Sequence, residues 1–118
     1  MSKHEKQTSF NSIIKETLPA AASTISDNLE GYVLTGENCQ VVFWEVKEAF
    51  YVDAHSHPHA EWGIVVSGSC DLGLDGEVKT YKAGEMFYVP PGIPHTSKMS
   101  DNYRAIDFFN SNDWIKTK

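Results

Sequence analysis

The chain has 118 residues and a formal net charge of −6, from 10 basic and 16 acidic side chains. This length fits one domain with a small core, and no run of apolar residues is long enough for a transmembrane helix. Lysine and arginine form no cluster, which argues against nucleic acid and against an anionic membrane surface as partners.

Residues 1–30 form an N-terminal segment that begins with a polar stretch. Apolar residues recur at helix-like spacing between positions 10 and 18, and Pro19 ends the run. We expect a short helical or irregular segment here, partly disordered or packed on the rest of the chain or on a partner.

From residue 31 onward the pattern changes to short β-rich runs separated by Gly, Pro, Asn and Asp. Asp75-Gly76, between two such runs, predicts a two-residue hairpin turn. Many short strands at regular spacing are typical of an all-β sandwich or barrel, which we place at residues 31–112 with a C-terminal tail at 113–118. The expected strands are residues 31–35, 40–46, 50–57, 62–66, 70–74, 78–81, 86–89, 95–99 and 104–109.

The chain has two cysteines, Cys39 and Cys70, which form neither a CxxC motif nor a spaced framework. Reduced thiols are the simplest interpretation. The N-terminus also lacks the apolar region of a secretory signal. We therefore expect a cytoplasmic protein.

Two short stretches supply a set of metal-ligating side chains. Residues i and i+2 of a strand share a face, so His55 and His57 point the same way, and Glu61 follows at an even step. His95 would arrive on a neighbouring strand. Each residue alone fits an ordinary surface position, but together three imidazoles and a carboxylate suit one divalent transition metal ion (Fe, Mn, Ni, Zn or Co), with positions left open for water or substrate.

The same stretches carry a family resemblance. The pattern H-x-H-x3-E-x6-G begins at His55, and G-x5-P-x-G-x2-H begins at Gly84. The chain therefore resembles the small single-domain bacterial cupins over about residues 31–110. The resemblance implies an RmlC-like, double-sheet jelly-roll β-barrel with the metal in its lumen.

Two positions depart from the cupin pattern. Ala49 stands where the family usually has a glycine, and Met99 stands where it usually has an asparagine. Neither is a ligand position, but Met99 makes one wall of the pocket more apolar. We also expect Tyr51 and Asp53, which precede His55 on the same strand, to reach the pocket.

Asp107 and Phe109 alternate on the last expected strand. This D-x-F pattern resembles the end of uronate-linearising cupins, which implies that Asp107 acts as acid or base near the metal and that Phe109 lines the site. A carboxylate in that position is otherwise a surface group. His59 shares the alternation of the ligand histidines, so it is a candidate fifth ligand or proton shuttle. It is otherwise an imidazole at the pocket rim, because Pro58 disturbs the strand.

If Glu61 faces the lumen, Trp62, Ile64 and Val66 face outward on the same strand. Three large apolar side chains are rarely left in water together. We expect them to pack on the N-terminal segment or on a second subunit, and we predict a homodimer.

An open-faced metal in an apolar barrel favours a metal-dependent enzyme acting on a small oxygen-bearing molecule such as a sugar acid, by isomerisation, ring opening, lyase or dioxygenase chemistry. The alternatives are a non-catalytic module that binds a small ligand or metal, and a metal-stabilised scaffold. The net negative charge argues against a strongly anionic substrate, unless the metal together with Lys98 or Arg104 overrules it.

Overall fold

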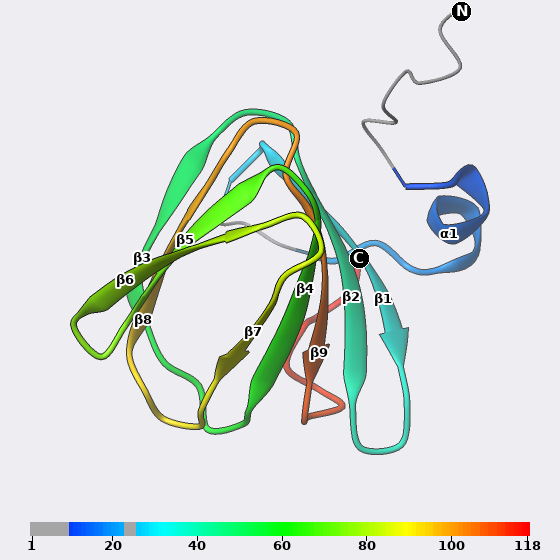
Figure 1. Cartoon of the computed structure of the whole chain (residues 1–118). Coiled ribbons are helices and arrows are strands. Elements are labelled where there is room, and N and C mark those ends of the chain that lie inside the picture. The colour runs from blue at the N-terminus through cyan, green and yellow to red at the C-terminus, as the bar shows by residue number, and fades with distance from the viewer. Residues whose placement is uncertain (1–9, 23–25) are drawn as a thin grey trace, which may run out of the picture.

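The computed structural model describes residues 10–22 and 26–118, and within them nine antiparallel strands form two facing sheets (Figure 1). One sheet has the order β1-β2-β9-β4-β7 and the other β3-β8-β5-β6. This arrangement confirms the predicted all-β jelly roll. The strands are β1 (Leu29–Thr35), β2 (Gln40–Val46), β3 (Phe50–His55), β4 (Glu61–Ser67), β5 (Ser69–Leu74), β6 (Glu77–Lys82), β7 (Met86–Val89), β8 (His95–Met99) and β9 (Arg104–Phe109).

Side-chain alternation places the apolar residues of the strands between the two sheets. In β4, for example, Gly63 and Val65 are buried, whereas Trp62 and Ile64 are exposed on the outer face. One cluster of buried residues draws mainly on β4, β5, β7 and β8, and a second joins the inner faces of β1, β2 and β9. The second cluster consists of Ala21, Val33, Val42 and Phe109.

The N-terminal helix is shorter than its apolar spacing suggests. Helix α1 (Ser12–Thr17) begins after Asn11, whose side-chain oxygen accepts a hydrogen bond from the Ile13 backbone N–H at 2.8 Å. None of its residues is buried, and it packs on the outer face of β1 and β2 through a Lys15–Glu45 ion pair of 2.9 Å (Figure 1). The expected polar stretch at residues 1–8 lies outside the described residues. Among those that are described, no helix is long and apolar enough to span a membrane.

The hairpin between β5 and β6 confirms the turn predicted at Asp75-Gly76. Leu74 pairs with Glu77, so two residues connect the strands. Both have positive φ angles, 51° at Asp75 and 81° at Gly76, which is the backbone that a primed turn requires.

Strand β3 ends earlier than predicted. It stops at His55, which pairs with His95 of β8, and its register shifts between Val52 and His55. His57 therefore lies in the loop before β4 and not on the strand. Pro58, which has no N–H to donate, explains why the pairing does not continue through this segment.

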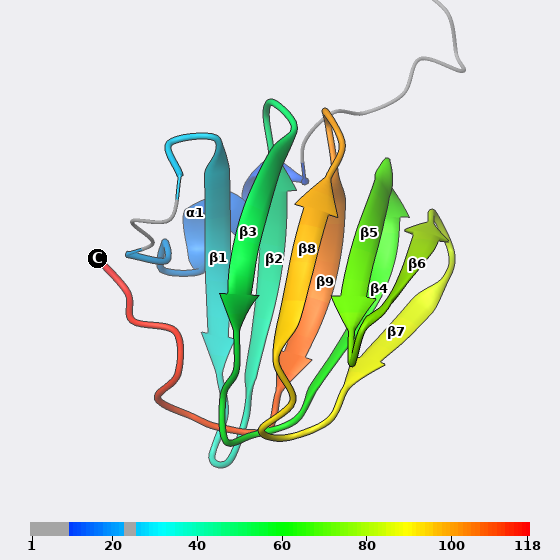
Figure 2. The ribbon, with the colours of Figure 1, turned by 90° about the vertical axis from the view of Figure 1, so that its left-hand side faces the viewer.

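The end of the chain is not a free tail. After β9 it returns along the β1 edge of the barrel (Figure 2), where Thr117 forms a β-bridge with Ala21. The Lys118 N–H also donates to the Ala20 carbonyl at 2.9 Å. Residues 113–118, expected to be a tail, thus pair with the segment that precedes β1.

Candidate metal centre

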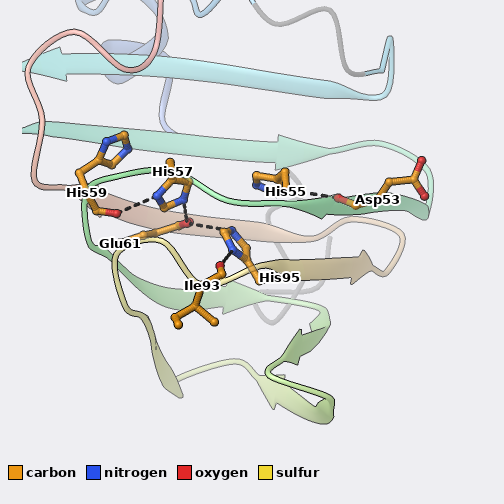
Figure 3. A network of polar contacts seen from close by, with 7 residues as sticks. All are labelled: Asp53, His55, His57, His59, Glu61, Ile93 and His95. Atoms are coloured by element: carbon orange, nitrogen blue, oxygen red, sulfur yellow. Dashed lines mark hydrogen bonds and ion pairs between the residues drawn. The ribbon is translucent and has the colours of Figure 1, made fainter.

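Three histidines converge at one end of the barrel (Figure 3). His55 ends β3, His57 lies in the β3–β4 loop, and His95 begins β8. One ligand nitrogen from each lies within 4.8 Å of the others. His57 and His95 are each only 3% exposed, whereas His55 is open to solvent. Two sides of the centre are therefore closed and one is accessible.

A backbone carbonyl fixes each of the three rings. The Nδ1 atom of His57 lies 2.7 Å from the His59 oxygen, that of His95 lies 2.9 Å from the Ile93 oxygen, and that of His55 lies 3.1 Å from the Asp53 oxygen. A carbonyl only accepts, so Nδ1 carries the hydrogen and donates in all three cases. In the neutral ring, Nε2 then keeps its lone pair for a metal.

The turn before β8 holds the two motif stretches together. Gly92 has a φ of 75°, a left-handed conformation that favours glycine, and its N–H donates to the His57 carbonyl at 2.8 Å. The glycine of the second motif thus fixes the loop that carries a histidine of the first.

Glu61 supplies a carboxylate at the same point. Its Oε1 atom lies 3.2 Å from Nε2 of His57 and 3.8 Å from Nε2 of His95. The hydrogen bond with Glu61 raises the pKa of His57. Burial alone would raise the pKa of Glu61, but its contacts with His57 and Asp107 outweigh burial and hold that pKa below its usual value. Glu61 is therefore ionised, as a metal ligand must be.

Asp107 stands next to Glu61 and is 7% exposed. Burial, together with the negative charge of Glu61, raises the pKa of Asp107 well above its usual value. Two adjacent buried carboxyl groups cannot both be ionised, so the pair holds one proton, and it resides on Asp107. The Oδ1 atom of Asp107 is buried and has no hydrogen-bond partner among the described residues.

Cys70 and Tyr103 also adjoin Asp107, and the sequence analysis assigned neither to the site. Burial raises the pKa of the Cys70 thiol to about 12, with a further contribution from Asp107. Burial likewise raises the pKa of Tyr103. Both groups are neutral at physiological pH, so they give Asp107 no compensating charge.

The histidines open into a cavity of about 740 Å³, within the usual range for a small-molecule site. All four residues expected in the pocket line it: Tyr51, Asp53, Met99 and Phe109. Glu61, Asp107, Cys70 and Tyr103 line it too.

His59 is not among the described residues that line this cavity. Its ring stacks on His57 at a centroid distance of 4.5 Å and lies on the side of His57 away from His55 and His95 (Figure 3). Burial, followed by the nearby His57, lowers the pKa of His59. Its backbone oxygen accepts the hydrogen bond that orients His57.

Lys98 and Arg104, the cations expected near the pocket, do not line it. Arg104 donates from Nε to the Ser67 hydroxyl at 3.0 Å, and Lys98 is exposed on β8. The lining instead includes Trp114, Ile115 and Lys116 from the C-terminal segment. Residue spacing gave no signal for these three, because they enter the site through tertiary contacts.

A family model described as a cupin domain matches residues 42–105. The chain belongs to the cupin family. The match includes both strands that carry ligand histidines and most of the barrel around them. No significant match was found among curated proteins.

Solved structures similar to this cupin support the same fold. An RmlC-like cupin from Shewanella frigidimarina is 23% identical with a TM-score of 0.73, over 93% of this chain and 95% of that one. KdgF from Halomonas sp. is 20% identical with a TM-score of 0.69, over 75% and 84%. Bacillus subtilis oxalate decarboxylase, described with Mn(II) centres, is 18% identical with a TM-score of 0.71, over 86% of this chain and 30% of its own. At these identities the likeness concerns the fold alone.

The donor chemistry of this cupin fits a divalent metal ion. His55, His57 and His95 could hold one through three oriented nitrogens, and Glu61 adds an ionised oxygen within 4 Å of two of them. Mixed nitrogen and oxygen ligands suit first-row transition metals.

Proposed function

We propose that this cupin is a metal-dependent enzyme that transfers a proton on a small oxygen-bearing substrate, with sugar acids as the expected class. The observation that carries the proposal is the buried Asp107 carboxyl group, which lines the cavity beside Glu61 and whose pKa is raised by burial and by the charge of Glu61. A carboxyl group with a raised pKa close to a metal centre is typical of acid–base catalysis. Isomerisation, ring opening and elimination all require such a group.

The proposed cofactor is one divalent transition metal ion, Fe, Mn, Ni, Zn or Co, held by His55, His57, Glu61 and His95. When bound, such an ion polarises a carbonyl or hydroxyl oxygen of the substrate. Metal availability, rather than affinity alone, selects among these ions.

Asp107 is the proposed acid or base. Its surroundings keep it protonated in the resting site, because it is buried and Glu61 holds the negative charge of the pair. A proton delivered to the substrate leaves two neighbouring carboxylates, which favours its return from the product. His59 stays a candidate proton shuttle. Any proton relayed from its ring to the cavity has to pass the ring of His57, on which it stacks.

The Asp107→Asn variant tests this role. An amide can still donate to Glu61, so the ligand keeps its position and the metal should stay bound. The amide cannot transfer a proton, so we expect a loss of roughly 100-fold or more in rate. Incorporation of solvent deuterium into a panel of sugar acids, followed by NMR, detects the proton transfer before the product is known. Asp27→Asn, at an exposed position that does not line the cavity, is the matched control.

Two outcomes would contradict the proposal. Loss of metal from Asp107→Asn would make Asp107 a structural or ligand residue instead of the acid. Absence of exchange in the metal-loaded wild type with every sugar acid would favour a non-catalytic ligand-binding cupin.

We also propose a homodimer formed through the outer face of β7, β4 and β9. Trp62 lies between its cross-strand neighbours Tyr88 and Phe108, with ring centroids 5.2 and 5.5 Å away. All three rings, with Ile64 and Met86, are exposed. The contacts of α1 described above lie on β1 and β2, which leaves a second copy as the proposed cover for this apolar face.

A further inference from the structure

The last nine residues, 110–118, form what we call the C-terminal strap. Gln40, 2% exposed, holds its centre: the side-chain Nε2 donates to the Ile115 carbonyl at 3.0 Å, and the Ile115 N–H donates to Oε1 at 2.8 Å. The Ala22 N–H donates to the Lys116 carbonyl at 2.8 Å. The backbone on either side of the Lys116 side chain is therefore fixed, although the side chain itself is exposed.

The strap reaches the candidate metal centre through Trp114. The indole lies 5.4 Å from the His57 ring and 4.9 Å from the His59 ring, measured between centroids. It is 39% exposed, so part of its surface stays available to a ligand. Trp114 also lines the cavity, so an aromatic wall stands directly beside a proposed metal ligand.

Lys116 adds a positive charge to the same wall. Among the described residues that line the cavity, it is the one lysine or arginine. No hydrogen bond or ion pair from its side chain to another described residue competes for the ammonium group. The remaining charged lining groups are Asp53, which is exposed to solvent, and Glu61, which the metal would neutralise.

We propose that the C-terminal strap forms the specificity subsite of the cavity, in which Lys116 pairs with a carboxylate of the ligand and Trp114 supports the ligand's less polar face. Recognition of a carboxylate specifies which group of a sugar acid the site would bind. This inference rests on the function proposed above. Pairing with a carboxylate is favourable because hydrogen bonds between an ammonium group and a carboxylate are charge-assisted.

The test compares the binding of D-glucuronate and D-glucose, which differ in the carboxylate, to Zn²⁺-loaded and to metal-free protein by NMR titration. We expect the wild type to bind glucuronate at least tenfold more tightly than glucose. Lys116→Gln should remove most of that preference and leave glucose binding unchanged, and Lys116→Arg should retain it. Lys118→Gln, the same charge change two residues along the strap and outside the cavity lining, is the matched control. Trp114→Ala should weaken the binding of both sugars.

An unchanged preference in Lys116→Gln, or a wild type that binds glucuronate no better than glucose, would overturn the proposal. So would an equal loss in Lys118→Gln, because it would point to general charge attraction. Because binding is measured without turnover, a Lys116-dependent preference in a protein that shows no deuterium exchange would contradict only the enzyme proposal. Exchange that persists unchanged in Lys116→Gln, without a loss in glucuronate affinity, would contradict only the strap proposal.

Discussion

His57 is the residue on which most interactions of the candidate centre meet. Its Nδ1 donates to the His59 carbonyl, its Nε2 faces Glu61, and its ring contacts His59 and Trp114. The carboxylate raises its pKa, whereas burial lowers the pKa of His95. Protonation of the two buried imidazoles therefore has opposite effects on the stability of the metal-free protein.

In the metal-free protein, the raised pKa of His57 gives a stability contribution that is present below about pH 6.5 and is lost as the pH rises through the folded-state pKa. The lowered pKa of His95 gives a stability contribution that is present above about pH 6.5. This contribution is lost as the pH falls through the folded-state pKa of His95. Metal binding requires both rings to be neutral.

We therefore predict that Zn²⁺ affinity falls as the pH decreases, by about tenfold per pH unit for each proton that the metal displaces. Below the raised pKa of His57, the proton on the His57 ring is the first that competes with the metal. Titration calorimetry in buffers of different ionisation enthalpy measures both the affinity and the protons released. An affinity that stays constant between about pH 5.5 and 8 would contradict the histidine ligand set.

Strand β4 combines a proposed metal ligand, Glu61, with the close packing that positions Asp107. Glu61 and Gly63 share its inner face, and Gly63 pairs with Asp107 of β9. A Cβ atom at Gly63 would overlap the Phe87 ring and lie 2.7 Å from Oδ1 of Asp107. The absence of a side chain at this position thus makes room for both residues.

We predict that Gly63→Ala destabilises the protein by about 1–3 kcal/mol through overpacking and displaces Asp107. Gly73→Ala in β5 is the matched control, because its added Cβ would meet chiefly the hydroxyl end of Thr96, which can rotate away. Urea unfolding measures the free energies of unfolding. Incorporation of solvent deuterium into sugar acids measures the proton transfer proposed for Asp107. Equal stability of the two variants would contradict the packing described for β4.

At the scale of the whole molecule, the outer face of the five-stranded sheet has two different parts. Helix α1 lies over β1 and β2 (Figure 1). Strands β7, β4 and β9 instead expose a row of three neighbouring aromatic side chains. Such a row is typical of an interface between copies rather than of a solvated face.

We predict that the wild type has twice the chain mass in light scattering and that Trp62→Glu shifts it to the monomer. Val78→Glu, which adds a charge at a 71% exposed residue of β6 in the other sheet, should leave the mass unchanged. A monomeric wild type at micromolar concentration would contradict the dimer.

The sequence predicted the parts of the site that depend on local spacing. The jelly roll, the Asp75-Gly76 turn and the convergence of His55, His57 and His95 were expected from the motifs, although His57 lies in a loop and not on the strand that alternation assumed. Alternation did not place His59, because β3 ends at His55 and the residues beyond it form a loop.

Contacts between distant residues were beyond the sequence pattern. The Gln40–Ile115 hydrogen bonds join residues 75 positions apart, and they bring Trp114 and Lys116 to the cavity. Cys70 and Tyr103 come close enough to Asp107 to feel its charge only because β5 and the turn before β9 border the same lumen. No spacing within one segment encodes these contacts.

The central claim is a metal held by His55, His57, Glu61 and His95, and elemental analysis tests it most directly. The protein should be purified without added metal and without a nickel column, alongside His95→Ala. We predict about one equivalent of Fe, Mn, Ni, Zn or Co in the wild type and its loss in the variant. Absence of metal from both proteins, even after reconstitution, would contradict the metal centre and the function proposed for it.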